Sequence, residues 1–408
     1  MPETGWRLRG RVPAAALVMT AVVVFAGAAH AESKYSLLLL GERIWAGEVR
    51  AISLGSDMQL LEDSLALQYN PAAWSMIRKV TFTSSGYFSS DRLRSDEYNE
   101  REASVRFSTF MIAFPLTRRF TLGVGYRGKY DATANFVTPM TTADGDRYGE
   151  FFNRIGGLSN YPFTAAVHVA RALQVGGYFS IERGSIEDRW DIIFADPTKN
   201  VATSSQKRTM SGTGYGLAAV LRPLRNVSLG AVYEGEIEYD TNVLEQHSNS
   251  SSNRAYNETT RLPARWTMSA AWRVQPGYSV YGTYSFSDFT QFEGLDFPGE
   301  QLAREDAVSV GFEYGKGLPV WSLRLPIRLS ATYTRYPYEY PVDESITSLL
   351  FGLGLGLKLR GGMSKVDVAF QGGYMGDLDK NGIDDRMFRV YVGFNGSEIW
   401  RRKRGADY

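Results

Sequence analysis

The stretch from Leu262 to Phe286, LPARWTMSAAWRVQPGYSVYGTYSF, alternates apolar and polar residues on both sides of one tight turn, Gln275-Pro276-Gly277. Period-two alternation predicts a strand with one apolar and one polar face. Long strands with aromatic residues near the ends of the apolar face are typical of a transmembrane β-barrel hairpin, with lipid outside and water inside. A soluble sandwich would give the same alternation in shorter strands. The apolar face consists of Leu262, Ala264, Trp266, Met268, Ala270 and Trp272, and then of Tyr278, Val280, Gly282, Tyr284 and Phe286.

The composition agrees with a barrel. A chain of 408 residues with 45 basic and 44 acidic residues has a net charge of +1, which gives no indication of a nucleic-acid partner. The mean hydropathy of -0.25 is too polar for a helical membrane protein but suits a barrel, in which only alternate residues face lipid. The chain has no cysteine, which excludes disulfides, thiolate metal sites and thiol nucleophiles.

The N-terminus predicts a secreted protein. Arg7, Arg9 and Arg11 form a basic region, residues 13–28 form an apolar core, and Ala29-His30-Ala31 is a cleavage site, so residues 1–31 are expected to be removed. An uncleaved anchor helix is the alternative. No later segment reaches the roughly 18 uncharged apolar residues of a membrane helix. A secreted chain that spans a membrane without helices should be a closed barrel, because lipid leaves no other way to satisfy the backbone.

The rest of the chain predicts an all-β, antiparallel transmembrane barrel of about fourteen strands. We place these strands near 80–90, 103–115, 119–131, 163–171, 173–184, 208–221, 226–240, 261–274, 277–288, 304–316, 322–336, 346–359, 362–375 and 386–395.

The connections between these strands alternate in length. Short turns are predicted at 116–118, 171–172, 222–225, 275–277, 317–321 and 360–361, and long polar loops at 91–102, 132–162, 184–207, 241–260 and 288–303. Short turns at one end and long loops at the other are the pattern of bacterial outer-membrane barrels, with the turns on the periplasmic side. We therefore expect a multi-pass protein of the bacterial outer membrane.

The residue pattern of the strand predicted at 226–240 indicates a charged lumen. In 226–240, the acidic side chains alternate with apolar ones, and glutamates cannot face hydrocarbon at low cost. We interpret them as lining the interior, paired with arginines on the next strand. Either a structural network of ion pairs or a binding or ion-selective lumen would give this pattern. The acidic residues are Glu234, Glu236, Glu238 and Asp240, and the proposed partners are Arg265 and Arg273.

Residues 32–78 lack strand alternation and precede the barrel, which we assign to 79–396. A fourteen-stranded barrel is wide enough to leave a channel unless something fills it. Because the segment is rich in apolar residues and ends in a turn fixed by Asn-Pro, we predict that it is a plug or hatch inside the lumen. The residues expected to form it are Leu54, Leu61, Leu65, Asn70, Pro71, Ala72 and Trp74. Residues 397–408 are predicted to form a basic periplasmic tail.

Two stretches resemble a known family. RAISLG (50–55), LEDSLA (61–66) and YNPA (69–72) are similar to the hatch segment of the FadL family, outer-membrane transporters of long-chain fatty acids and, in relatives, of aromatic hydrocarbons. LPARW (262–266) and SFSDFTQF (285–292) are similar to a strand of that family and the aromatic strand end that follows it. The family usually has Gly after Asn-Pro-Ala, whereas this chain has Ala73.

The resemblance implies a transport mechanism. Extracellular loops would capture a hydrophobic molecule, the lumen would bind it, the hatch would shift, and the molecule would leave sideways through a gap in the wall. In the family this gap lies at a kinked third strand, which here corresponds to 120–131. Glycines permit a bulge, and this strand contains Gly123, Gly125 and Gly128.

Two of the predicted loops carry apolar residues that could capture a substrate, because exposed apolar clusters often mark binding surfaces. The candidates are Phe136, Phe151, Phe152, Trp190 and Phe194. The alternative is that the two loops pack against each other as a cap.

A possible Ca²⁺ site lies in the last predicted extracellular loop. Oxygen-bearing side chains at Asp377, Asp379, Asn381 and Asp385, with a glycine between them, resemble the start of an EF-hand loop. Position twelve of such a loop would be Phe388 rather than Glu, which excludes a complete EF-hand. An ordinary hairpin loop is the alternative, and no cofactor is expected to be required.

The sequence predicts a channel rather than an enzyme, because His168 and His247 are the only histidines after the signal segment and neither has a catalytic partner nearby. We expect uptake of hydrophobic small molecules by a monomer that contacts outer-membrane lipid and lipopolysaccharide. A plugged barrel that acts as an assembly platform for secreted or surface proteins is the competing hypothesis. A general porin is disfavoured, because an open pore needs no plug.

Overall fold

The computed structural model describes residues 39–56, 58, 60, 67–94, 99–142, 147–196, 201–248, 253–294, 302–320, 323–339, 344–359 and 363–398. The predicted signal peptide, Leu61, Leu65 and most of the basic tail lie outside the described residues.

Strands dominate the described chain. In order, the elements are β1 (Glu42–Arg43), α2 (Val49–Ile52), η2 (Pro71–Met76), β2 (Val80–Arg94), β3 (Asn99–Pro115), β4 (Phe120–Asp131), β5 (Ala134–Thr141), β6 (Arg147–Ala170), β7 (Leu173–Phe194), β8 (Ala202–Leu224), β9 (Val227–Glu234), β10 (Ile237–His247), β11 (Arg254–Leu262), β12 (Arg265–Gln275), β13 (Tyr278–Asp288), η3 (Phe289–Gln291), β14 (Arg304–Val320), β15 (Leu323–Glu339), β16 (Ser345–Lys358), β17 (Ser364–Asp377), α3 (Leu378–Asn381) and β18 (Ile383–Glu398).

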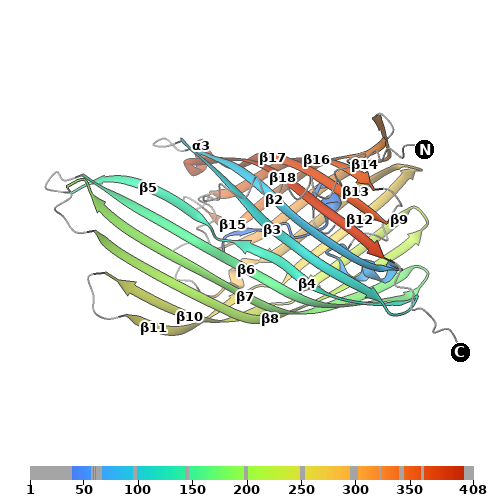
Figure 1. Cartoon of the computed structure of the whole chain (residues 1–408), viewed down its shortest axis with the longest axis horizontal. Coiled ribbons are helices and arrows are strands. Elements are labelled where there is room, and N and C mark those ends of the chain that lie inside the picture. The colour runs from blue at the N-terminus through green and yellow to red at the C-terminus, as the bar shows by residue number, and fades with distance from the viewer. Residues whose placement is uncertain are drawn as a thin grey trace, which may run out of the picture.

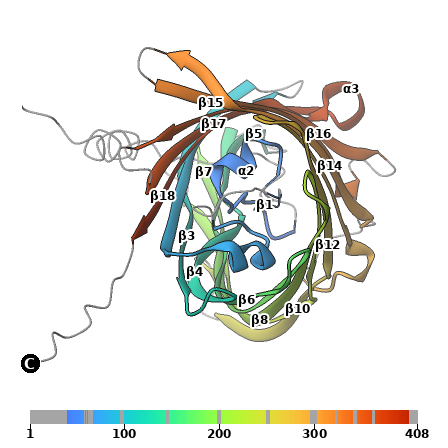
Figure 2. The same ribbon diagram turned by 90° about the vertical axis from the view of Figure 1, so that its right-hand side faces the viewer.

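The strands form one closed antiparallel barrel of fourteen wall strands, which confirms the predicted fold class. Three wall strands are interrupted and counted in two parts, β4 with β5, β9 with β10, and β11 with β12, whereas β1 lies inside the wall. The barrel closes between β18 and β2, where Glu398 is opposite Val80. Figure 2 shows the view along the barrel, with β1 and α2 inside the ring of strands.

The hairpin at Leu262–Phe286 forms as predicted. Trp266 pairs with Phe286 across β12 and β13, and the chain turns at Pro276-Gly277. Trp266 and Met268 are 41% and 50% exposed on the outer surface, whereas Thr267 and Ser269 are 3% and 9% exposed on the inner one. Alternate side chains therefore divide between the lipid face and the lumen.

Three of the predicted loops are wrong, because residues 132–162, 184–207 and 241–260 consist largely of strands. They lengthen β6, β7 and β8 to between 22 and 24 residues and add β5, β10 and β11 beside them. These strands continue past the rest of the barrel as a projecting sheet (Figure 1). Since each strand pairs with a neighbour, extension satisfies the backbone polar groups without a separate loop structure.

The predicted direction of the acidic residues in 226–240 is correct only for the first of them. Glu234 points inward, but two residues separate it from the next inward side chain, Ile237, so the alternation shifts by one residue. An extra residue of this kind is a β-bulge, which reverses the faces of everything after it. Glu236 and Glu238 therefore lie on the outside, where they pair with Arg261 rather than with a lumen arginine.

The segment before the barrel lies in its interior. α2 packs against β16, β17 and β18, and η2 packs against β6, β7 and β8 on the opposite side. Ala51, Ile52, Leu54 and Trp74 are fully buried. Among the described residues, no helix is long and apolar enough to cross a membrane.

Candidate functional site

The barrel wall has a gap between its second and third strands. β3 pairs with β4 only from Thr109 opposite Arg127 to Pro115 opposite Thr121. Beyond Thr109, β3 pairs with β2 alone, and β5 pairs with β6 alone. Arg106 spans the gap by donating from Nη2 to Asp131 Oδ1 at 3.2 Å and to Thr133 Oγ1 at 2.6 Å. The wall is thus held together here by side chains instead of a backbone ladder.

The interior segment supplies the backbone that β3 leaves out. β1 pairs with the uncovered edge of β4, with Glu42 opposite Asp131 and Arg43 opposite Tyr130, and Ile44 N donates to Lys129 O at 3.0 Å. Gly41 permits the approach, because it has a φ of +97° and a Cβ there would overlap the Asp131 carbonyl. The interior segment and the gap are therefore joined by backbone pairing.

The three glycines predicted to mark a lateral opening lie on the lumen side of β4 or at its unpaired end. Gly123 lies beneath the Trp74 ring and Gly125 beside Met111, both within the paired part of the strand. Gly128 follows the last β3–β4 pair and contacts Ile44, next to a shift of register between β4 and β6. The structure places Gly128 at the gap and the other two below it.

The predicted Asn-Pro turn begins η2. Asn70 Oδ1 accepts from Ala72 N at 3.0 Å, which caps the helix, and Pro71 occupies its first turn. Trp74 Nε1 donates to Gln68 O at 2.7 Å, so the buried indole is satisfied. The same turn packs tightly against the wall at Gly176, because a Cβ there would lie 2.6 Å from Ala72 N.

Replacing Gly123 with alanine should lower the free energy of unfolding by about 1 to 3 kcal/mol, the usual cost of overpacking. The new methyl group would lie 2.3 Å from Trp74 Cζ3, and the indole has little room to move. Urea titration of the barrel in detergent micelles, followed by tryptophan fluorescence, measures the effect. Gly282→Ala is the matched control, because its Cβ would meet only Ser309 O at 4.0 Å. Equal stability of the two variants would contradict the packing.

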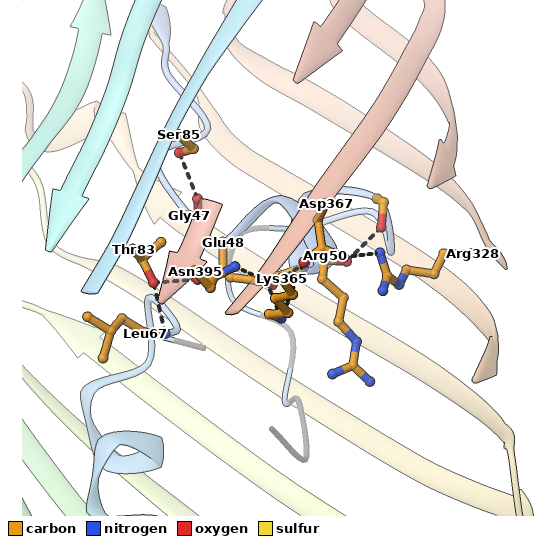
Figure 3. Close-up of polar contacts among 12 residues, drawn as sticks. Gly47, Glu48, Arg50, Leu67, Thr83, Ser85, Arg328, Lys365, Asp367 and Asn395 are labelled. Carbon is orange, nitrogen blue, oxygen red and sulfur yellow. Dashed lines mark hydrogen bonds and ion pairs between the residues drawn. The ribbon is translucent and has the colours of Figure 1, made fainter. Parts of the chain in front are cut away.

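A buried ion-pair network attaches α2 to the wall. Arg50 donates from Nε and Nη2 to the two Glu313 oxygens at 2.8 and 2.6 Å, and Arg328 Nε donates to Glu313 Oε1 at 3.0 Å. Arg328 also donates to Asp367 Oδ1 at 2.7 Å, and Lys365 lies 3.3 Å from the same carboxylate. Figure 3 shows Arg328, Asp367 and Lys365 arranged beside the plug helix.

Glu48, the N-cap of α2, completes the network. Its Oε1 accepts from Lys365 Nζ at 2.7 Å and from Asn395 Nδ2 at 3.0 Å, and Thr83 Oγ1 donates to Asn395 Oδ1 at 2.5 Å (Figure 3). Burial raises the pKa of the Glu48 carboxyl above its usual value, and the Lys365 ammonium opposes that rise. The sequence prediction missed this network, although Glu313, Lys365 and Asp367 stand on the polar face of strands.

Above the network, toward the projecting sheet, the lumen contains an apolar layer. Two residues of the interior segment, Leu39 and Leu40, are buried at its centre among side chains from the wall. Tyr130, on the β4 edge beside the gap, packs against this layer. The wall contributes Ala132, Leu158, Ile186, Met210, Ile237, Tyr239, Leu262, Phe289, Tyr338, Ile346, Leu350, Met375 and Met387.

Beside the apolar layer are two small, charged cavities, of about 30 and 60 Å³. Both are lined by Arg43 and Arg265, and Glu234 or Glu305 lies in the wall of each. Arg265 Nη1 donates to Glu305 Oε1 at 2.9 Å, so its partner is Glu305 rather than the neighbouring Glu234. Each cavity has room for a few water molecules at most.

The projecting sheet brings together three of the predicted capture residues. The Phe136 and Phe152 rings stack at 5.0 Å, and Phe152 and Trp190 meet edge to face at 5.1 Å. Phe194 stands one step farther along, 5.6 Å from the Tyr148 ring. Phe151 points to the opposite face and is 36% exposed. An open depression of about 490 Å³ adjoins this aromatic row and is lined by Trp190.

The residues of the predicted Ca²⁺ site surround the short helix α3. Asp377 Oδ1 accepts from Asp379 N at 3.0 Å, and Asn381 Oδ1 accepts from Asp377 N at 3.1 Å, so both side chains cap backbone groups. Asp385 is fully buried in β18. Within the described ranges, no group of three or more acidic, histidine or cysteine side chains is placed to hold a metal. The Ca²⁺ site stays a prediction.

Comparison with known proteins places the chain in a family. A family model described as BamG matches residues 11–407. The chain belongs to the BamG family. No curated protein sequence matches it.

Solved structures similar to this BamG-family chain share its fold. A FadL homologue from Pseudomonas aeruginosa has a TM-score of 0.60 at 12% identity, covering 87% of this chain and 98% of that one. The toluene transporter TodX of Pseudomonas putida has a TM-score of 0.58 at 11% identity over 88% and 100% of the two chains. The monoaromatic hydrocarbon channel CymD has a TM-score of 0.54 at 13% identity over 88% and 99%.

These comparisons confirm the FadL-like architecture of the barrel. Two of these neighbours are described as a toluene transporter and a monoaromatic hydrocarbon channel. From the pattern of turns and loops in outer-membrane barrels, we expect the end with short turns to be periplasmic and the projecting sheet to be extracellular.

Proposed function

We propose that this protein is an outer-membrane channel for the uptake of hydrophobic small molecules, such as long-chain fatty acids or aromatic hydrocarbons. The observation that carries the proposal is the gap beyond Thr109, where β1 of the interior segment pairs with the open edge of β4. A plug strand attached to a wall opening can couple its own displacement to opening of the wall. The resemblance of the fold to hydrocarbon channels supports the same function.

The route would begin at the aromatic row of the projecting sheet, where Trp190 lines the open depression and packs against the buried Phe152 ring. The molecule would then enter the apolar layer in the place that Leu39 and Leu40 now fill. Movement of the interior segment would withdraw β1 from β4. The molecule would leave through the gap beside Tyr130 and Arg106, into the outer leaflet, next to the smaller charged cavity, which Arg43 and Tyr130 also line.

A second candidate function is supported by two observations. Two lumen cavities beside the apolar layer hold only about 30 and 60 Å³, much less than a fatty acid needs. The projecting sheet has two edge strands in the described part of the chain: β5 pairs with β6 alone, and β11 pairs with β10 and otherwise only bridges Glu293 at Arg261. Unpaired edges can bind another strand. A plugged barrel that serves as an assembly platform for secreted or surface proteins would need both features.

Uptake of radiolabelled oleate and of radiolabelled toluene tests the proposal. A Gram-negative host that lacks its own hydrophobic-compound channels would express the full chain, and initial rates would be compared with an empty vector. Replacing Phe152 and Trp190 together with alanine should lower the rate about tenfold, because each aromatic contact contributes about 0.5 to 1.5 kcal/mol. Phe163→Ala with Phe179→Ala removes two exposed rings from the lipid face as the matched control.

The outcomes separate the two functions. The channel and the proposed entry are supported if the wild-type uptake rate exceeds the empty-vector rate and falls only in the Phe152 and Trp190 variant. Wild-type uptake equal to the vector for both probes rejects the channel, and the assembly platform becomes the better hypothesis.

A further inference from the structure

The periplasmic end of the barrel carries a ring of cations. They occur on or beside all six hairpin turns at that end, from β3–β4 around to β16–β17, so they encircle the barrel. All of them are exposed. We call this set the basic rim, and it consists of Arg118, Arg119, Arg171, Arg225, Arg273, Lys316, Arg324 and Lys358.

The positive charge of the basic rim is not balanced locally. The nearest acidic residues on these strands, Glu313 and Asp367, point into the lumen and are already paired with Arg50, Arg328 and Lys365. At the same end, the last strand contributes one exposed acid, Glu398. Apart from Arg273, the rim cations form no ion pair with any residue that the structure describes.

Cations at the extracellular end are arranged differently. Arg304 lies 2.8 Å from Asp306, Arg386 lies 3.1 Å from Asp384, and Arg261 lies 2.9 Å from Glu236. The extracellular end therefore places acidic residues beside several of its cations, whereas on the described strands the periplasmic end has one exposed acidic residue, Glu398. A solvated surface would need no such asymmetry, whereas a surface facing a negative partner would.

The position of the basic rim along the barrel axis indicates what it faces. The rim cations stand beside apolar side chains that point outward, including Leu116 at 59% exposure, Leu224 at 61%, Trp272 at 50% and Leu323 at 42%. Apolar residues exposed to this degree mark the edge of the lipid-facing band. Long basic side chains at that boundary extend their charge toward the headgroups and leave their stems on apolar surface.

We propose that the basic rim binds the phosphate groups of anionic phospholipids in the periplasmic leaflet of the outer membrane. Guanidinium and ammonium groups donate charge-assisted hydrogen bonds to phosphate oxygens, and clustered cations at a bilayer surface attract anionic lipid. The distribution around the whole circumference favours lipid over an acidic protein, which would contact one side of the ring. Lipid surrounds the barrel completely.

Electron spin resonance of spin-labelled lipids tests the proposal. The purified protein is reconstituted in phosphatidylcholine bilayers with trace spin-labelled phosphatidylglycerol or spin-labelled phosphatidylcholine, and the motionally restricted fraction of each label is measured. The wild type should retain phosphatidylglycerol about fivefold more strongly than phosphatidylcholine at low salt. The preference should fall markedly in 1 M NaCl, because salt screens exposed charges over about 3 Å at that concentration.

A matched pair of variants locates the effect. Replacing Arg118, Arg171, Arg225 and Arg324 with glutamine removes half of the rim cations and should clearly lower the preference for phosphatidylglycerol. Replacing Arg147, Arg183, Arg254 and Lys380 with glutamine removes the same charge from the extracellular end and should preserve it.

Heat-modifiable migration on gels confirms that both variants of this pair are folded. Equal retention of the two labelled lipids by the wild type would overturn the proposal, and so would an unchanged preference in the rim variant. The salt series on the wild type keeps the proposal testable if the rim variant fails to fold.

Discussion

Neutralising the two plug charges, with Glu48→Gln and Arg50→Met in one chain, should turn the barrel from a closed state into an ion-conducting one. The wall half of the network, Lys365, Asp367, Arg328 and Glu313, is neutral without the plug, so the wall should stay intact. The variant loses the hydrogen bonds of Arg50 to Glu313 and of Lys365 to Glu48, and hydrogen bonds to charged groups contribute about 1.5 to 3 kcal/mol each. Since about 1.4 kcal/mol is a factor of ten, the fraction of molecules with a docked plug should fall by a factor of a hundred or more.

Conductance in planar lipid bilayers measures this change. The wild type should show rare openings, and the double variant should show long-lived channels of the size expected for an unplugged fourteen-stranded barrel. The matched control neutralises an exposed pair on the projecting sheet, with Arg189→Gln and Asp191→Asn, and should behave as the wild type. A closed double variant with normal gel mobility would mean that apolar packing of Leu54 and Trp74 holds the plug without help from the charges.

The barrel wall was predictable because its signal is local. The alternation from Leu262 to Phe286 depends on neighbouring residues only, and all fourteen predicted strands are present. The Asn70-Pro71 turn was likewise predictable, since the cap and the restricted proline act within a few residues. Both features are determined before any long-range contact forms.

The reversal of faces after Glu234 was missed, although the isolated Gly235 at that point is a local sign of a bulge. β8 continues without a break past Gly235, and that neighbouring strand decides where the extra residue is tolerated. The ion-pair network was hidden for a related reason. Arg50 and Glu313 lie 263 residues apart in the sequence, and only the closed barrel brings them together.

The break beside the gap illustrates how the sequence signal can lie on a neighbouring strand. The third wall strand is interrupted between Asp131 and Ala134, where it has no glycine of its own. Across from it on β6, Gly156 and Gly157 have φ values of +120° and +153°, and Ala132 N donates to Gly156 O at 3.1 Å. Residues other than glycine rarely adopt these φ values, so the glycines that permit the break belong to β6.

Locking the plug strand to the gap should abolish uptake if the proposed exit is correct. Arg43 and Tyr130 are paired across β1 and β4, between the hydrogen-bonded pair at Ile44 and Lys129 and the pair at Glu42 and Asp131. Such a non-hydrogen-bonded pair has a Cα separation of about 4.5 Å, within the range of about 4.4 to 6.8 Å that a disulfide needs. Because the chain has no cysteine, Arg43→Cys with Tyr130→Cys introduces the only possible bridge.

The oxidised double-cysteine variant should take up labelled oleate or toluene about tenfold more slowly than after reduction with dithiothreitol, given an oxidation yield of about 90%. Ile112→Cys with Val124→Cys is the matched control, since this pair joins β3 and β4 below the gap, on the lipid side, and its oxidation should leave the rate unchanged. The single variants Arg43→Cys and Tyr130→Cys separate the effect of the bridge from loss of either side chain. If uptake continues at the full rate through the bridged protein, β1 need not leave β4 and the molecule exits elsewhere.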